Sequence, residues 1–501
     1  MRDQLLHLSS GSHANLQGQI REMLVSAILD GHIPAGNVLP SCRKLALQLG
    51  VARNTVVLAY QQLVEEGYLI ARERSGYYVN KDILAGRVDR EQHAAAHCKT
   101  ELKWGKRLKL EPSAQRNIVK PRDWQKYPYP FIYGQFDPAL FPVSDWRECA
   151  REALSIAAIR EWARDSVDSD DPLLIEQIRT RVLPRRGVWA SPEEILVTVG
   201  AQQALYIIAS LLIDAHTVVG VEEPGYPDAR NILASRRCAL VPLPLDDMGL
   251  VVDERLRACE YVYVTPSHQS PTTLTMPLAR RRQLLAQAAD TDLVVIEDDY
   301  ESETNYLGEP TLALKGLDVD GRVIYVGSLS KTLAPGLRLG YLVAAPELVR
   351  EARALRRLIL RHPPANNQRA VALFLARGHH DSLVRRLSHA YKDRWQAMGD
   401  ALSHYLPDSA RVPTFGGTSF WVKGPGHLDA RELQRRALEH GILLEAGEVH
   451  FMAEHPPLNC FRLGFSSIAV DRIEPGVRKL AALVHELADE SRLHAGADKS
   501  P

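Results

Sequence analysis

The chain has 501 residues, a formal net charge of zero, 45% hydrophobic and 24% charged residues, which are ordinary values for a globular protein. This length predicts two or three domains rather than one core. No apolar run is long enough to cross a bilayer and the first residues lack the apolar core of a signal peptide, so we expect a cytoplasmic protein with no membrane contact.

Residues 13–81 are predicted to form three short helices followed by two strands. The first helix is marked by apolar residues at helical spacing between Leu16 and Ile28. A second and a third helix follow, and the helices are expected to end at Gly31, Gly50 and Gly67. Two short strands then surround a turn at Ser75-Gly76.

This order of elements is typical of a winged helix-turn-helix, whose third helix enters the major groove of DNA. At its N-terminal end, Arg53 can fork onto guanine, Asn54 can pair with adenine, and Thr55 can reach a phosphate or a thymine methyl. Arg72 and Arg74 lie on the predicted hairpin, where a wing would meet DNA. The alternative is a helical protein-interaction module that binds no DNA.

Residues 82–130 are interpreted as a long, partly disordered linker, because they have no sustained period and contain four prolines. Residues 81–130 carry 12 Lys and Arg against 6 Asp and Glu, whereas the residues after 130 carry 42 against 49. A basic segment of this kind indicates a polyanionic partner, although a solvated linker would have the same composition.

From 131 to 492, apolar strand-like runs alternate with helical stretches, which predicts an α/β domain with a mostly parallel central sheet. The six cysteines of the chain lack metal-type spacing. We therefore expect free thiols and no metal site.

One motif of this domain meets the chemical demands of pyridoxal phosphate. Lys331 lies in the turn after an apolar strand and would supply the amine for a Schiff base. Ser328, Ser330 and Arg338 would hold the phosphate, the arginine as a two-pronged donor. The alternative for a lone lysine in such a turn is a surface charge.

Further candidates lie at the ends of other predicted strands, where open α/β sheets bind ligands. Asp298 would pair with the pyridine nitrogen, and Tyr300 would reach the ring oxygen. The backbone N–H groups of Ala201 and Gln202 open a helix and suit a phosphate. Tyr226 is a candidate for stacking on the ring, although a tyrosine that only packs shows the same pattern.

Arg462 lies in a short apolar strand. Because arginine is rarely buried without a partner, we expect it to clamp a carboxylate of the ligand. The alternative is an internal salt bridge.

The stretch from Leu39 to Leu69 resembles the long motif of the GntR family of bacterial regulators. The resemblance implies that the DNA contacts are Ser41, Arg43, Arg53, Asn54, Thr55 and Gly76. Ala52 departs from the serine usual in that family, which removes a side-chain cap from the recognition helix.

The large domain resembles fold-type I aminotransferases, and the whole chain resembles the MocR-like (GabR-type) subfamily of GntR regulators. The motifs that carry this resemblance begin at Asp137, Glu222, Thr265, Ile296 and Ser328. It implies a winged helix-turn-helix fused to an aminotransferase-like domain that binds pyridoxal phosphate, in a head-to-tail homodimer. It also implies a regulator that binds promoter DNA and senses a small amino compound through an aldimine at Lys331.

Three positions depart from the family pattern around the expected ligand pocket. Ser270 stands where related aminotransferases carry Asn, and Thr273 and Leu174 stand where the family carries Gly. Two alternatives follow. The chain is an active aminotransferase with a vestigial DNA-binding head, or it is a regulator whose altered 270–273 loop no longer admits the cofactor.

Overall fold

The structure, a computed structural model, describes residues 15–84, 103–301, 303–307, 311–407, 409 and 416–497. It divides into two compact units, Met1–Leu108 and Lys109–Pro501. The second unit therefore includes residues 109–130, the C-terminal part of the predicted linker. Residues 85–102 of that linker and the first two residues of the predicted head lie outside the described residues.

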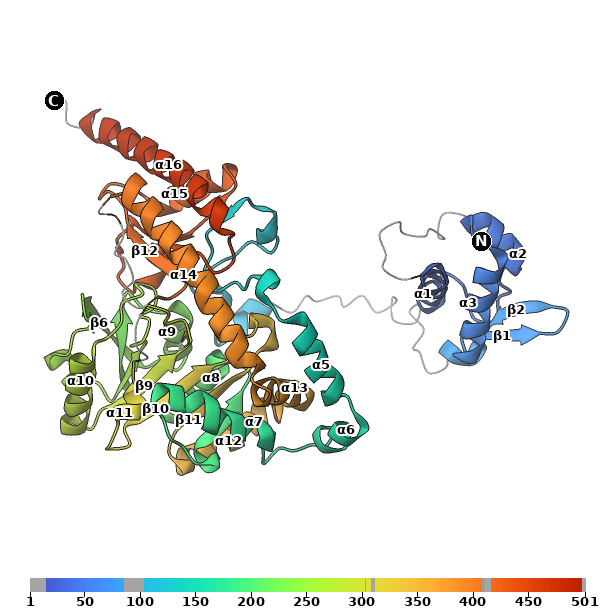
Figure 1. The fold of residues 1–501 in the computed structure, drawn as a ribbon, viewed down its shortest axis with the longest axis horizontal. Helices are drawn as coiled ribbons and strands as arrows, with labels where there is room; N and C mark the ends of the chain where they lie inside the picture. The colour runs from blue at the N-terminus through green and yellow to red at the C-terminus, as the bar shows by residue number, and fades with distance from the viewer. Residues whose placement is uncertain are drawn as a thin grey trace. The chain divides into compact units, whose positions relative to one another are not determined.

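The first unit contains the predicted three helices and hairpin (Figure 1). Its elements are α1 (Leu16–Leu29), α2 (Cys42–Leu49), α3 (Arg53–Glu65), β1 (Leu69–Arg72) and β2 (Gly76–Val79). The apolar faces of these helices share one core, in which Ile20, Leu24, Leu45, Tyr60 and Leu63 are fully buried. The two strands pair antiparallel. This is the winged helix-turn-helix that the sequence predicts.

The second unit is built on a mixed sheet in the order β4-β11-β10-β9-β8-β5-β6-β7. These strands are β4 (Ile195–Thr198), β5 (Val218–Glu223), β6 (Ala239–Asp246), β7 (Gly249–Leu250), β8 (Tyr261–Val264), β9 (Val294–Asp299), β10 (Val323–Ser328) and β11 (Gly340–Val343). Neighbours from β10 through β9, β8 and β5 to β6 pair in parallel. The mostly parallel sheet predicted from the sequence is confirmed.

Helices cover both faces of this sheet. The helices between Val143 and Tyr405 are α5 (Val143–Ala153), α6 (Ile156–Trp162), α7 (Pro172–Gln177), α8 (Ala201–Leu212), α9 (Pro227–Ala234), α10 (Leu278–Thr291), α11 (Leu314–Leu317), α12 (Pro346–Leu360), α13 (Ala365–Ala376) and α14 (His379–Tyr405). Along β4, Ile195 and Val197 pack into one hydrophobic cluster and Leu196 into another. Because side chains alternate along a strand, the two clusters lie on opposite faces of the sheet.

A smaller sheet follows in the chain, in the order β12-β15-β14. The elements of this region are β12 (Ser419–Lys423), α15 (Ala430–Glu439), β13 (Ile442–Leu443), β14 (Glu445–Ala446), β15 (Cys460–Gly464) and α16 (Val470–Ala497). Figure 1 shows α14 (orange) leading from the large sheet to this region, where it packs against α16 (red). The short strand β3 (Tyr129–Pro130) pairs in parallel with β13.

The cysteines of the described residues are free thiols. Among those residues no helix is long and apolar enough to cross a membrane. No group of three or more His, Cys, Asp or Glu side chains suited to a metal ion occurs in the same part of the chain.

Candidate functional site

Four strands of the large sheet end at one edge. β5, β9 and β10 run in parallel, and β4 runs the same way as β10 because each pairs antiparallel with β11. The loops that follow their carboxyl ends are therefore neighbours in space, although they are far apart in the sequence. This is the edge at which open α/β sheets bind ligands.

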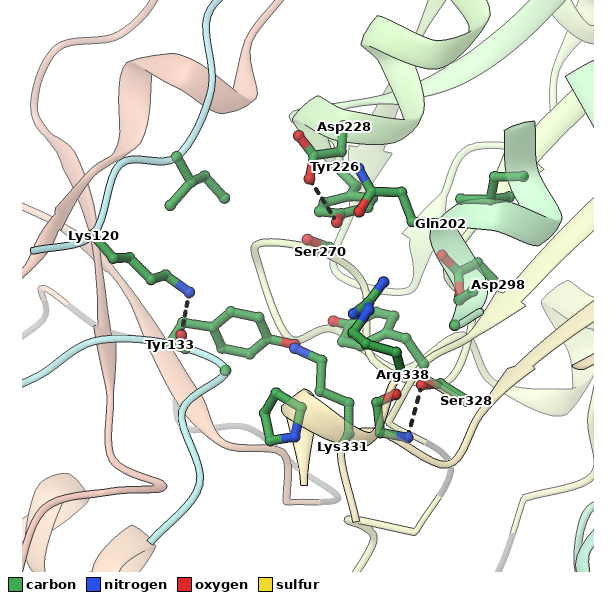
Figure 2. A pocket seen from close by; sticks show the side chains of 18 residues that line it. Lys120, Tyr133, Gln202, Tyr226, Asp228, Ser270, Asp298, Ser328, Lys331 and Arg338 are labelled. Atoms are coloured by element: carbon green, nitrogen blue, oxygen red, sulfur yellow. Dashed lines mark hydrogen bonds between the residues drawn. The ribbon is translucent and has the colours of Figure 1, made fainter. Parts of the chain in front are cut away.

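A cavity of about 340 Å³ lies at this edge and is lined by all nine residues that the sequence predicts to bind the cofactor (Figure 2). These are Ala201, Gln202, Tyr226, Asp298, Tyr300, Ser328, Ser330, Lys331 and Arg338. The cavity is also lined by residues for which the sequence predicts no contact with the cofactor, which are Ile118, Lys120, Tyr133, Gly134, Gly200, Leu205, Asp228, Ser270 and Pro335.

Lys331 carries its amine into the middle of the cavity. The nitrogen lies 4.4 Å from the centre of the Tyr133 ring and 5.9 Å from that of Tyr300. Burial disfavours the charged form and lowers the pKa of Lys331 to about 8. A lysine amine with a pKa near neutrality is partly unprotonated and can act as a nucleophile toward an aldehyde.

Asp298 is the last residue but one of β9, and only 3% of its surface is exposed. Its Oδ2 atom accepts a hydrogen bond of 2.8 Å from the hydroxyl of Tyr263. Its Oδ1 atom is buried and has no hydrogen-bond partner among the described residues. Burial raises the pKa of Asp298 to about 7. An unpaired buried acceptor on the wall of a cavity calls for a donor from a ligand, and a protonated pyridine nitrogen is such a donor.

The cavity also offers donors for a phosphate. The helix α8 begins at Ala201, directly after Gly200, which has a φ of +80°. The first N–H groups of a helix have no partner within the helix, so those of α8 can donate to a phosphate. A Cβ at Gly200 would lie 2.9 Å from Nη2 of Arg338, so glycine lets this guanidinium approach the helix start. The hydroxyl of Ser328 accepts from the N–H of Ser330 at 3.2 Å, which fixes the turn before Lys331.

The two predicted ring contacts are already engaged with protein atoms. The hydroxyl of Tyr300 donates to the backbone oxygen of His268 at 2.8 Å. That of Tyr226 donates to Oδ2 of Asp228 at 3.0 Å. Both side chains line the cavity.

Arg462 does not line the cavity. It is 2% exposed, and its guanidinium donates to Glu445 at 2.5 and 2.8 Å. The internal salt bridge, which the sequence left open as an alternative, is therefore present. The guanidinium carbon also lies 3.9 Å from the centre of the Tyr133 ring, and Tyr133 itself lines the cavity. A role in clamping a ligand carboxylate stays a prediction.

The departures from the family pattern also take up definite positions. Ser270 lines the cavity, and Leu174 is buried in α7. Thr273 has a φ of +62°, in the left-handed region that favours glycine. Its N–H donates to the backbone oxygen of Gln269 at 2.7 Å. The turn that glycine would form without strain is thus retained by a β-branched residue.

In the first unit, the predicted DNA contacts lie on its helix-turn-helix and hairpin. Arg43, Arg53, Asn54 and Gly76 are exposed and Thr55 is half-buried, while the hydroxyl of Ser41 accepts from the N–H of Lys44 at 3.3 Å and caps α2. At the start of α3, Ala52 provides no side-chain cap. The first turn of the predicted recognition helix therefore presents an arginine and an asparagine side chain to a partner.

Comparison with known proteins gives two family matches. Aminotransferase class I and II matches residues 135–480, and the gntR family of bacterial regulatory proteins matches residues 16–79. The HTH-type transcriptional regulator TauR of Rhodobacter capsulatus is 42% identical over 95% of this chain and 97% of its own. The probable rhizopine catabolism regulatory protein MocR of Rhizobium meliloti is 30% identical over 95% of both.

Among solved structures, LysN, the α-aminoadipate aminotransferase of Thermus thermophilus, superposes on 77% of this chain and 100% of its own. The TM-score is 0.69 and the sequence identity 30%. That structure is complexed with N-(5'-phosphopyridoxyl)-L-leucine.

Proposed function

The chain belongs to the MocR-like regulators, in which a GntR head is fused to an aminotransferase class I and II domain, and we propose that it senses a small amino compound through Lys331. It is a transcription regulator that depends on pyridoxal phosphate. The observation that carries the proposal is that one chain combines a recognition helix with a cavity lined by a lysine, a buried acid and phosphate donors.

Bound pyridoxal phosphate supplies an aldehyde that condenses reversibly with primary amines. Lys331 is the residue we assign to that aldehyde, and Oδ1 of Asp298 is the acceptor we assign to the pyridine nitrogen. Ser328, Ser330, Arg338 and the N–H groups at the start of α8 are assigned to the phosphate. With pyridoxal phosphate bound, Lys331 would hold its aldehyde, and a primary amine of the ligand would compete with Lys331 for it.

The head is assigned to double-stranded DNA at a promoter. Arg53 and Asn54 are exposed in the first turn of α3, where base-reading side chains of a helix-turn-helix lie. We propose the head-to-tail homodimer usual for such regulators, since two heads would read two half-sites. A bacterial regulator that binds DNA works in the cytoplasm, and we expect the same of this chain.

The experiment combines a visible spectrum with DNA binding. Purified protein should absorb in the visible range, and Lys331→Ala should lose the absorbance of the lysine-bound cofactor. A fluorescent duplex from the DNA upstream of the gene should be bound with a preference over unrelated duplex, and Arg53→Ala should abolish that preference. Adding the amino ligand should change both the spectrum and the DNA affinity.

Each outcome separates the candidate functions. Wild-type protein and Lys331→Ala that are equally colourless would exclude the cofactor. If unrelated duplex competed as well as the upstream duplex and Arg53→Ala did not change DNA binding, a function as a sequence-specific regulator would be excluded. Steady turnover of an amino donor with a keto acceptor, together with no effect of the donor on DNA binding, would instead favour an active aminotransferase with a vestigial head.

A further inference from the structure

Lys331 lines two cavities. One is the cavity at the sheet edge, and the other is a much smaller space of about 10 Å³, which is roughly the room that one water molecule needs. The small one, here called the acid cavity, has Glu301, Thr304 and Thr418 in its wall, and these three residues do not line the larger one. Gly134 lines both, and a Cβ there would be 2.8 Å from the nitrogen of Lys331. Glycine therefore keeps space open beside the amine.

Glu301 is held in the wall of the acid cavity by two segments of the chain. Its backbone oxygen accepts from the N–H and the hydroxyl of Thr304 at 3.1 and 2.9 Å. Its Oε1 atom accepts from the hydroxyl of Thr418 at 2.6 Å. The residue is 4% exposed and forms no ion pair within the described part of the chain. A carboxylate buried in this way is stabilised by a positive charge in its surroundings.

The other titratable side chains on which the charge of Glu301 acts are an imidazole and four phenols. Burial lowers the pKa of His268, whose Nδ1 atom has no hydrogen-bond partner among the described residues. A Cβ on Gly417 would lie 3.5 Å from that atom and 3.8 Å from Oε2 of Glu301. Burial raises the pKa of the four phenols, which belong to Tyr133, Tyr300, Tyr306 and Tyr391. All five groups are therefore neutral near pH 7, and none of them balances the carboxylate.

Lys331 is the cation on which Glu301 acts. Burial lowers the pKa of its amine to about 8, and among the neighbouring charges that of Glu301 opposes this shift most strongly. The charges of Lys120 and Arg462 lower the pKa further, and that of Glu445 raises it. The protonated amine of Lys331 thus depends on nearby acids.

Two further acids lie near this amine and are engaged elsewhere. Glu445 forms ion pairs with Lys120 at 3.5 Å and with Arg462 at 2.5 Å. Asp298, on which the charge of Lys331 also acts, is the acid assigned to the pyridine nitrogen. Glu301 is the acid that remains for the amine.

We propose that Glu301 is the counter-ion of the Lys331 amine whenever that amine is free, and that it thereby favours the displacement of Lys331 by the primary amine of a ligand. Glu301 is a positioning residue, because it lines the acid cavity and not the cavity of the cofactor. The second half of the proposal rests on the proposed function. The first half concerns two residues of the chain and holds without the cofactor.

The link between the two halves is the charge of the free lysine. Only the neutral form of an amine attacks an aldehyde, so a carboxylate that keeps Lys331 protonated makes it a weaker competitor for the cofactor. Without this carboxylate the pKa of the free amine falls, and a larger fraction is neutral at any pH below it. Lys331 would then hold the aldehyde more firmly against a ligand.

The first test measures the free amine in cofactor-free protein. Trace labelling with acetic anhydride at a series of pH values, followed by mass spectrometry of the peptide that contains Lys331, gives the pKa of this one lysine. In Glu301→Gln the midpoint should fall by about one pH unit, because an opposite charge is lost. Glutamine still offers an oxygen to the hydroxyl of Thr418, so the wall of the cavity is kept. Glu301→Asp should retain most of the wild-type pKa.

Glu303 provides the matched control. It lies two residues further along the same segment, its side chain is 12% exposed, and it pairs with Arg185 at 3.2 Å. Its charge is not among the main causes of the pKa of Lys331. Glu303→Gln should therefore leave the midpoint of Lys331 labelling where it is in the wild type.

The second test measures displacement. Methylamine, a primary amine without any other group, is titrated into cofactor-loaded protein and followed by visible absorbance. At about pH 6.5, Glu301→Gln should bind methylamine roughly tenfold more weakly than the wild type, since one pKa unit is a factor of ten in protonation. At about pH 10 the free lysine is neutral in both proteins, and the two affinities should agree. General damage to the site would weaken binding at both pH values.

The proposal is wrong if Glu301→Gln and the wild type give the same midpoint for Lys331, or if Glu303→Gln lowers it as much. A midpoint that falls while the affinity for methylamine stays equal at both pH values would overturn the second half. Failure of the proposed function looks different: methylamine would then leave the visible spectrum of every variant unchanged, whereas the labelling of Lys331 would still report its pairing with Glu301.

Discussion

The hydroxyl of Tyr263 donates to Oδ2 of Asp298 at 2.8 Å and leaves Oδ1 of the same buried carboxylate without a partner among the described residues. One oxygen is thereby fixed by the protein and the other is directed to the cavity. This division orients the acid without using up its capacity to accept a hydrogen bond from a ligand.

Asp298→Asn should weaken the binding of pyridoxal phosphate by about tenfold to a hundredfold, because a hydrogen bond between charged groups contributes about 1.5–3 kcal/mol. Titration of cofactor-free protein, followed by visible absorbance, measures this. Tyr263→Phe removes only the orienting bond and should have a smaller effect. Equal affinity of wild type and Asp298→Asn would show that this acid does not contact the ring nitrogen.

The attachment of the cofactor should depend on pH through Lys331. Burial lowers the pKa of its amine to about 8, and only the neutral amine attacks an aldehyde. The rate of attachment to cofactor-free protein should therefore rise about tenfold per pH unit below pH 8 and level off above it. Stopped-flow absorbance measures the profile.

The same profile has an internal control. The positive charge of Lys120 is among the causes that lower the pKa of Lys331. Lys120→Met should consequently move the midpoint to higher pH. A rate that continues to rise through about pH 10 would indicate an amine with an ordinary lysine pKa.

Glu445→Gln should destabilise the large unit by about 3–5 kcal/mol, because it leaves the guanidinium of Arg462 buried without a counter-charge. Urea unfolding followed by circular dichroism measures the loss. A double variant, Glu445→Gln with Arg462→Met, should recover part of it. If the single and double variants were equally stable, the loss of stability would not come from the unpaired charge of Arg462.

The ion pair of Glu445 and Arg462 should also contribute to the dependence of stability on pH in acid. Burial would raise the pKa of Glu445, but the charges of Arg462 and Lys120 outweigh it and hold the pKa below its usual value. The pair therefore stabilises the fold above the ordinary glutamate pKa of about 4.3 and loses its contribution as the pH falls through the lower value of the folded state. The Glu445→Gln variant should lack this part of the acid dependence.

Ala52→Ser should stabilise α3 by about 0.5–1 kcal/mol, because a serine at this position can accept from an N–H of the first helical turn. Amide exchange of residues in α3, measured on the full chain, should slow accordingly. Ser41→Ala is the matched opposite change, since Ser41 caps α2, and it should speed exchange there. Unchanged exchange in Ala52→Ser would mean that a capping hydrogen bond does not form.

Much of the site could be predicted because its residues follow strands that the sequence shows clearly. Asp298 and Lys331 each come just after a run of buried apolar residues, and parallel strands bring such positions to one edge. The family resemblance then supplied their roles. The same reasoning located the recognition helix, since its glycines and apolar spacing are local signals.

The rest depended on contacts between distant segments. Lys120 lies in a stretch without period, and only its packing against Tyr133 and Glu445 brings it to the cavity. The partner of Arg462 is Glu445, which stands directly opposite it across the antiparallel pair of β14 and β15. The register of two short strands cannot be read from their sequences, so the choice between a ligand clamp and a salt bridge stayed open.

The assignment of residues 109–130 to the large unit has a consequence for building hybrid regulators. A chimera that joins a foreign head at residue 130 would discard Lys120 and with it part of the ligand cavity. A junction placed before Lys109 would keep the whole second unit, with every residue that lines the cavity.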